Sequence, residues 1–212
     1  MPDESYCQIT IWRRKQYEIL YIYLCGVGGQ GIGLLSEILL RGADYAGLQA
    51  KGVDTHGLAQ RGGIEISHLR LGDAIHSPMI STRKADLVVA LERHEAMRGA
   101  DSALRDRGCL VYYNTVLQPL GVRLGLDEEV SETLLYESCQ VRGITVHKVE
   151  NEKLDDPRMQ NIAILANIDK NKLIPHVEKH HLIQAMGDLM KGSMLKKNMA
   201  VFNKSSSQSW QN

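Results

Sequence analysis

The sequence predicts an α/β fold of three layers, in which a mostly parallel β-sheet carries helices on both faces. Apolar segments of strand length alternate along the chain with amphipathic segments of helix length, which is typical of repeated βαβ units. A glycine also stands between a predicted helix and the next predicted strand at Gly47, Gly108 and Gly143, and glycine is the residue that most often follows the end of a helix. With 212 residues, the chain is long enough to bury the core of one such domain.

The first part of the predicted domain contains strands and one amphipathic helix. Residues 17–25 are rich in Ile, Leu and Tyr and almost free of charge, as is typical of a strand covered on both faces. A helix follows the glycine-rich segment after this strand, and a short second strand is predicted at residues 49–53. In the third strand, residues 64–71, the apolar alternation slips at Ser67-His68, which indicates either a β-bulge or burial on both faces.

The second part continues the alternation of helices and strands. Asp156-Pro157 is a favourable N-cap and first-turn pair for one of its helices. Residues 128–142 form another predicted helix, whose apolar face consists of Val130, Leu134, Leu135 and Val141. The remaining predicted elements are strands at 85–91, 109–113 and 144–149, and helices at 92–107, 156–166 and 177–190.

The elements place one α/β domain at residues 17–203. Residues 1–16 are predicted to be an N-terminal extension, and residues 204–212, rich in Ser and Gln, a disordered tail. The 25 basic side chains balance the 25 acidic ones, so the net charge favours neither nucleic acid nor an anionic membrane as a partner. No apolar segment approaches the ~18 residues that span a bilayer, and the N-terminus does not have the pattern of a secretory signal.

The four cysteines, Cys7, Cys25, Cys109 and Cys139, have no CxxC spacing. The sequence therefore contains neither a zinc motif nor an iron–sulfur motif, and we expect no metal site in this chain. Cys25 and Cys109 fall in predicted strands and are interpreted as small buried hydrophobic residues. Unpaired cysteines of this kind indicate a reducing compartment, so we expect a cytoplasmic protein.

A glycine-rich turn links the first strand to the first helix. Residues 26–33 read GVGGQGIG, so that Gly26, Gly28 and Gly31 match the GxGxxG fingerprint in its strand–turn–helix context. Glycines allow positive φ angles and a close approach to the backbone, and a helix N-terminus favours an anion. We therefore expect Gly26, Gly28, Gly29, Gln30 and Gly31 to bind a ligand, and we expect the fold to be Rossmann-like.

A second polar loop lies at the carboxyl end of the second strand, where ligands bind in open α/β sheets. It contains His56, Gln60, Arg61 and Gly62. Arg61 either presents its guanidinium group to a phosphate or a partner's carboxylate, or ties this loop to a neighbouring one. His56 is either an acid–base group or, as we favour, a hydrogen-bonded structural residue. Asn114-Thr115 forms a third polar cluster at the same edge.

The chain has no convincing catalytic set. There is no Ser/His/Asp order, no GxSxG motif and no P-loop lysine. Glu92 and Glu95 begin a helix, where carboxylates relieve the positive helix dipole more often than they catalyse. Asp54 stands where a ribose-binding acid would stand, which leaves an independent NAD(P)- or flavin-dependent oxidoreductase as an alternative function.

Several motifs taken together resemble one family. GVGGQGIG at residues 26–33, THGLAQRGG at 55–63 and SHLRLG at 67–72 are similar to the gamma domain of 2-oxoacid:ferredoxin oxidoreductases. The HGxAQRGG form and ALERHEAMR at 90–98 resemble the branch that contains the indolepyruvate ferredoxin oxidoreductase beta subunit. The resemblance extends over residues 19–203.

This resemblance implies an enzyme complex that oxidatively decarboxylates a 2-oxo acid, here indolepyruvate or another aryl pyruvate, to acyl-CoA and reduces ferredoxin. It implies a partner subunit of alpha type that carries thiamine diphosphate, Mg and [4Fe–4S] clusters, since this chain lacks their motifs. This chain would be the non-catalytic subunit, binding no cofactor alone. Its glycine loop would contribute to the binding of coenzyme A, with the second polar loop beside it.

Overall fold

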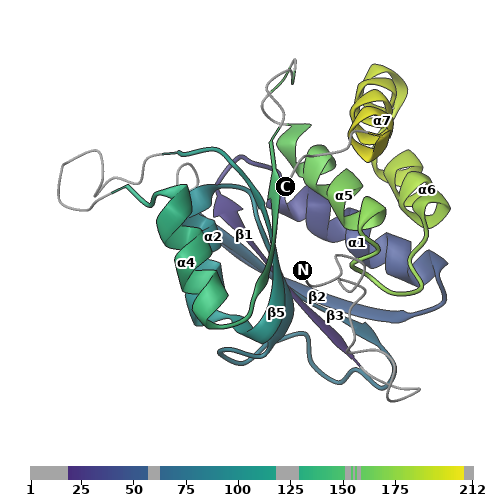
Figure 1. Ribbon diagram of the computed structural model, residues 1–212. Coiled ribbons are helices and arrows are strands. Elements are labelled where there is room, and N and C mark those ends of the chain that lie inside the picture. Colours follow the sequence, from purple (N-terminus) through teal and green to yellow (C-terminus); the bar gives the residue numbers. More distant parts are fainter. Residues whose placement is uncertain are drawn as a thin grey trace, which may run out of the picture.

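A computed structural model describes residues 19–56, 63–117, 129–150, 154, 156 and 159–207 of the chain. In this part, six strands form one sheet in the order β2-β3-β1-β4-β5-β6 (Figure 1). The β1–β4, β4–β5 and β5–β6 pairs are parallel, whereas β3 runs antiparallel between β1 and β2. The strands are β1 (Leu20–Val27), β2 (Gln49–His56), β3 (Ile64–Gly72), β4 (Ala85–Ala90), β5 (Leu104–Tyr113) and β6 (Thr145–Val149).

Helices cover both faces of the sheet, which confirms the predicted three-layer class (Figure 1). Leu20, Ile22 and Leu24 of β1 pack in a core cluster with one helical layer, whereas Tyr23 and Cys25 pack with the other. Each fully buried Leu or Ile contributes about 1.5–3 kcal/mol to the free energy of folding. The first layer contains α1 (Ile32–Tyr45), α5 (Gln160–Lys170), α6 (Lys179–Leu189) and α7 (Gly192–Ser207), and the second α2 (Arg93–Ser102) and α4 (Glu132–Val141).

The glycine prediction is confirmed at two of its three positions. Gly47 follows α1 with a φ of 77° and Gly143 follows α4 with a φ of 63°. The prediction for Gly108 is wrong, because α2 ends at Ser102 and Gly108 lies within β5. The pairing of β4 with β5 shifts register between Leu104 and Cys109, and a Cβ on Gly108 would lie 2.6 Å from Leu104 Cδ1. Gly108 therefore permits a bulge in a strand rather than ending a helix.

The slip at Ser67-His68 is not a bulge. β3 pairs in continuous register with β1 and with β2, and the Ser67 side chain is fully buried. The second interpretation, burial on both faces, is also wrong: Ser67, Leu69 and Leu71 are buried on one face, whereas Ile66, His68 and Arg70 are half-buried on the other. The pattern slips because a polar residue, Ser67, occupies the buried face.

Helix α4 is shorter and more exposed than predicted. It begins after Ser131, whose hydroxyl accepts a hydrogen bond from the Leu134 amide, and it buries only Leu135 and Cys139. Leu134 and Val141 were expected to be buried but are 48% and 89% exposed. The expected apolar face was too wide, because α4 contacts the sheet along a single narrow stripe.

The end of the chain also differs from the prediction, which placed no separate helix after residue 190. α5 begins at Gln160 rather than at Asp156, and Pro157 lies outside the described residues. α7 continues to Ser207, four residues into the predicted tail, because the buried Phe202 and Ser205 keep its last turns packed. Residues 1–18 and 208–212 also lie outside the described part. Within that part, no helix is long and apolar enough to cross a membrane.

Candidate functional site

The glycine loop lies at the carboxyl end of β1 and leads directly into α1. Gly29 has a φ of 97°, and Gly31 is the N-cap of α1 in a left-handed conformation, with a φ of 84°. The Gly28 amide donates a 2.8 Å hydrogen bond to the Gly63 carbonyl. Left-handed backbone is unfavourable for residues with a Cβ by about 1–2 kcal/mol, so glycine is required at two positions of this turn.

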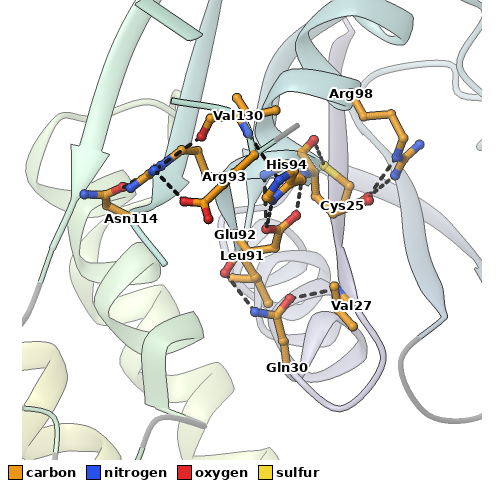
Figure 2. A network of polar contacts seen from close by, with 12 residues as sticks. Cys25, Val27, Gln30, Leu91, Glu92, Arg93, His94, Arg98, Asn114 and Val130 are labelled. Atoms are coloured by element: carbon orange, nitrogen blue, oxygen red, sulfur yellow. Dashed lines mark hydrogen bonds and ion pairs between the residues drawn. The ribbon is translucent and has the colours of Figure 1, made fainter. Parts of the chain in front are cut away.

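Gln30 fixes the shape of the loop from inside. Its side chain is 5% exposed, its Oε1 accepts a 2.7 Å hydrogen bond from the Val27 amide, and its Nε2 donates a 2.9 Å bond to the Leu91 carbonyl (Figure 2). The glutamine predicted to bind a ligand therefore uses its amide to join the end of β1 to the end of β4. A Cβ on Gly26 would lie 2.9 Å from Gln30 Oε1, so Gly26 makes room for this side chain.

Two helix N-termini meet at this loop. Asn161, in the first turn of α5, donates through Nδ2 to the Gly31 carbonyl at 3.3 Å. At α1 no side-chain hydrogen bond to the N-cap is found among the described residues, whereas in α5 the Asn161 Oδ1 accepts a 2.8 Å hydrogen bond from the Ile162 amide; neither helix has an acidic residue in its first turn. Free first-turn amides and the positive ends of two dipoles favour an anion. Among the described residues, no heavy atom lies within 4 Å of the position that a Cβ on Gly29 would take, so that part of the chain leaves this side of the loop open.

The second predicted loop touches the first at one of its ends. Gly63, at its end, accepts the hydrogen bond from Gly28. His56, at its start, is the last residue of β2 and pairs with Glu65 of β3, which separates it from β1. Gln60, Arg61 and Gly62 lie outside the described residues, and their roles stay predictions.

The third predicted cluster is a structural junction. Asn114 Oδ1 accepts hydrogen bonds from Arg93 (Figure 2). The Nδ2 of Asn114 donates to Glu132 and Glu150. The hydrogen bond from Asn114 is the main reason why the pKa of Glu132 is lowered. Arg93 completes the junction through the carbonyl of Val130. Sequence reasoning missed this role of Arg93, because its partners come from two distant segments, at Asn114 and at Val130 and Glu132.

Glu92 and Glu95 have the structural role that the sequence favours. Glu92 is fully buried as the N-cap of α2, and its carboxylate accepts hydrogen bonds from the amides of His94 and Glu95 (Figure 2). Burial raises the pKa of Glu92 above its ordinary value. Glu95 pairs with Arg98 on the same helix. These contacts account for both carboxylates without a substrate.

The position of Asp54 disagrees with dinucleotide recognition. In dinucleotide-binding domains the acid that binds ribose stands on the strand next to β1. Here the antiparallel β3 separates β2 from β1, so Asp54 stands about 10 Å from β1, or two strand spacings. Its Oδ1 instead accepts a 3.4 Å hydrogen bond from Ser36 of α1.

The cysteines of the described part do not fit an iron–sulfur cluster. Cys25, Cys109 and Cys139 are all buried and lie on β1, β5 and α4. The same part of the chain contains no group of three His, Cys, Asp or Glu side chains placed to hold a metal ion. Burial also raises the pKa of the Cys25 thiol, which keeps it protonated.

A family model and two curated relatives show which proteins this sequence is similar to. A family model described as pyruvate ferredoxin/flavodoxin oxidoreductase matches residues 21–208. The indolepyruvate oxidoreductase subunit IorB of Archaeoglobus fulgidus is 44% identical over 96 residues, which cover 45% of this chain and 46% of that relative. The subunit of the same name from Methanothermobacter thermautotrophicus is 28% identical over 186 residues, or 85% of this chain and 93% of the relative. The match thus spans about half of the first relative and nearly all of the second.

Solved structures share the fold. The 2-oxoglutarate:ferredoxin oxidoreductase of Magnetococcus marinus, solved with 2-oxoglutarate, coenzyme A and succinyl-CoA bound, has a TM-score of 0.68 at 17% identity. The match covers 91% of this chain and 31% of that one. The gamma subunit of the keto/oxoacid ferredoxin oxidoreductase of Geobacter sulfurreducens has a TM-score of 0.61 at 20% identity, with 88% and 96% covered. At these identities the likeness concerns the fold alone, and it agrees with the predicted Rossmann-like class.

Proposed function

Because the chain belongs to the pyruvate ferredoxin/flavodoxin oxidoreductase family, we propose that it is the gamma-type subunit of a cytoplasmic 2-oxoacid:ferredoxin oxidoreductase. The substrate is indolepyruvate or another aryl pyruvate, since the curated relatives are indolepyruvate oxidoreductase subunits. The complex cleaves the carboxyl group of the 2-oxo acid as carbon dioxide, joins the acyl group to coenzyme A and passes the electrons to ferredoxin.

The partner subunit carries the cofactors in this proposal. Thiamine diphosphate with Mg and the [4Fe–4S] clusters supply the decarboxylation and electron-transfer chemistry, and they bind to an alpha-type subunit. The buried and separate cysteines of the described part support this division, because they cannot ligate a cluster together. This chain then contributes binding and orientation rather than a catalytic group.

The glycine loop binds the diphosphate of coenzyme A in this proposal. The observation that carries it is the open side of the loop at Gly29, beside the uncapped N-terminus of α1. Amides of the loop and of the first helical turn donate to phosphate oxygens, and Gly29 allows the close approach. The predicted ligand residues His56, Gln60, Arg61 and Gly62 precede Gly63 in the sequence, and Gly63 accepts the hydrogen bond from Gly28, which supports a role for this segment in the same site. Arg61 supplies a guanidinium group to the same phosphates.

Two matched glycines test this role. Gly29 and Gly47 both have positive φ angles, and at neither does a heavy atom of the described part of the chain lie within 4 Å of a Cβ position. Gly29→Ala and Gly47→Ala therefore impose similar backbone strain at opposite ends of α1. In the complex purified with its thiamine-bearing subunit, Gly29→Ala should raise the Michaelis constant for coenzyme A about tenfold or more, equivalent to ~1.4 kcal/mol. Gly47→Ala should leave it unchanged.

Equal Michaelis constants for coenzyme A in the two variants would refute the role of the loop. The subunit assignment has a separate test, because the wild-type chain must co-purify with the thiamine-bearing subunit and be needed for oxidation of indolepyruvate. A calorimetric titration with NADH covers the alternative, an independent nicotinamide enzyme. Saturable binding of NADH to the chain alone would support that alternative and contradict the present proposal.

A further inference from the structure

The first residue of helix α5, Gln160, carries a buried amide. The residue is 6% exposed, and its side chain makes no hydrogen bond within the described part of the chain. The next residue, Asn161, uses both ends of its amide, because Nδ2 donates to the Gly31 carbonyl and Oδ1 accepts from the Ile162 amide. Buried polar side chains are nearly always hydrogen-bonded. The amide of Gln160 therefore indicates a partner from outside the chain.

The amide of Gln160 belongs to the end of α5 that meets the glycine loop. Side chains of an α-helix lean toward its N-terminus, and in α5 only the N-cap Met159 precedes Gln160. Asn161 contacts the Gly31 carbonyl from the same turn, and α5 lies beside α1 (Figure 1). The Gln160 side chain therefore leans toward the junction of the two helix N-termini, where first-turn amides and helix dipoles favour an anion.

The charge around the start of α1 differs between its two sides. On the side of β2, Asp54 Oδ2 lies 4.0 Å from the position that a Cβ on Gly33 would take, so a carboxylate flanks the first turn of α1. Helix α1 packs on β2 and β3, whereas α5 packs on β5 and β6, on the other side of α1 from Asp54. The first turn of α5 contains no acidic residue. An anion that extends beyond the first turn of α1 is therefore favoured toward α5 and disfavoured toward β2.

We propose that the start of α5 binds the second phosphoryl group of a diphosphate ester whose first phosphoryl group lies at the glycine loop, an inference that rests on the function proposed above. The Nε2 group of Gln160 donates a hydrogen bond to the second phosphoryl group, and the positive end of the α5 dipole stabilises its charge. Two phosphoryl groups that share one oxygen need donors close together, and the Asn161–Gly31 hydrogen bond joins the two helix starts. Gln160 is thus a residue that selects a diphosphate over a monophosphate.

The stability of two variants tests whether Gln160 has a structural partner. Methionine has nearly the shape of glutamine without its polar atoms, so Gln160→Met should leave the thermal midpoint of the full chain unchanged or raise it. Asn167 is the matched control, because it is 4% exposed in the same helix, about 10 Å further along. Its Oδ1 accepts a 3.0 Å hydrogen bond from Asn171. Asn167→Leu should therefore lower the midpoint.

Two nucleotides that differ by one phosphoryl group test the ligand. ADP and AMP share their adenosine, and each is measured as a competitive inhibitor against coenzyme A in the complex with the thiamine-bearing subunit. ADP should inhibit wild type more strongly than AMP. Gln160→Met should raise the inhibition constant of ADP and the Michaelis constant for coenzyme A about tenfold. It should leave kcat and the inhibition constant of AMP within about twofold of wild type, and Asn167→Leu should leave all four constants unchanged.

The outcomes separate this inference from the proposed function. If Gly29→Ala raises the Michaelis constant for coenzyme A and Gln160→Met does not, the role of α5 is refuted while the role of the glycine loop stands. If neither variant changes that constant, the role of the loop fails and this inference fails with it.

Three further results would overturn the role of Gln160. Equal weakening of ADP and AMP by Gln160→Met would show that Gln160 contacts a part that both nucleotides share. Inhibition of wild type by ADP that is no stronger than by AMP would show that the second phosphoryl group is not bound. A lower thermal midpoint of Gln160→Met would show that the amide has a structural partner.

Discussion

Replacing Gly31 by alanine should destabilise the chain more than replacing Gly29, although both residues have positive φ angles. The backbone strain is shared and costs about 1–2 kcal/mol at each position. Only Gly31 is also packed, because a Cβ there would lie 2.6 Å from Asn161 Nδ2. Asn161 is 2% exposed and donates its 3.3 Å hydrogen bond to the Gly31 carbonyl.

The added methyl group must displace this amide. A buried amide that loses its partner costs about 1–3 kcal/mol. We therefore expect Gly29→Ala to lower the free energy of unfolding by about 1–2 kcal/mol and Gly31→Ala by about 2–5 kcal/mol. The measurement is urea unfolding of the isolated chain followed by circular dichroism, with the midpoint compared at constant m-value.

A double-mutant cycle isolates the contact. Asn161→Ala should cost less in the Gly31→Ala background than in wild type, with a coupling energy of about 1–3 kcal/mol, because the clash has already removed the hydrogen bond. The same cycle with Gly29→Ala should be additive. Equal destabilisation by the two glycine variants, or additivity in both cycles, would refute the packing argument and leave backbone strain as the sole effect.

Three further predictions concern buried polar groups. Gln30→Ala removes both hydrogen bonds of a side chain that is 5% exposed. It should lower the free energy of unfolding by about 2–4 kcal/mol, measured by thermal or urea unfolding. A loss smaller than that of the exposed control Gln140→Ala would show that the Gln30 side chain does not hold the loop. Burial raises the pKa of Glu92, so the native state holds its proton more tightly than the unfolded chain, and stability should fall as pH rises from 4.5 through the folded pKa. Glu92→Gln should remove that decline, and parallel pH profiles would show that another group causes it. The Cys25 thiol, fully buried with a raised pKa, should resist iodoacetamide at pH 8 until the chain unfolds, which peptide mass mapping measures.

Local signals in the sequence were enough for the fold class and for most elements. Apolar runs predicted β4 and β6 to within one residue of their observed bounds and β1 to within three, and Gly47 and Gly143 follow helices as predicted. The helix end predicted at Gly108 was wrong, because the sequence does not distinguish a glycine required by a bulge from one that ends a helix. The antiparallel β3 between β1 and β2 left no local signal, since strand order depends on long-range pairing.

The candidate site was predictable at the backbone and not at the side chains. The glycine pattern located the turn, but Gln30 has its amide turned inward, and Asn114 belongs to a structural junction. Asn161, more than one hundred residues from the turn in sequence, packs against Gly31 and was not predicted. Its contact depends on how α5 crosses α1, which no local pattern encodes.

The hydrogen bonds that fix the glycine loop also explain why backbone amides, rather than side chains, bind the phosphate in the proposed function. Gly28 is held by Gly63, Gln30 by β1 and β4, and Gly31 by Asn161, so three distant segments fix the loop without a ligand. A loop that is fixed in advance loses little conformational entropy when a phosphate binds, and this raises affinity. Since the donors are amides, most side-chain changes on the loop surface should affect affinity little. A Cβ at Gly29 blocks the approach itself, and this is why one glycine, rather than a charged residue, is the sharpest test of the proposed function.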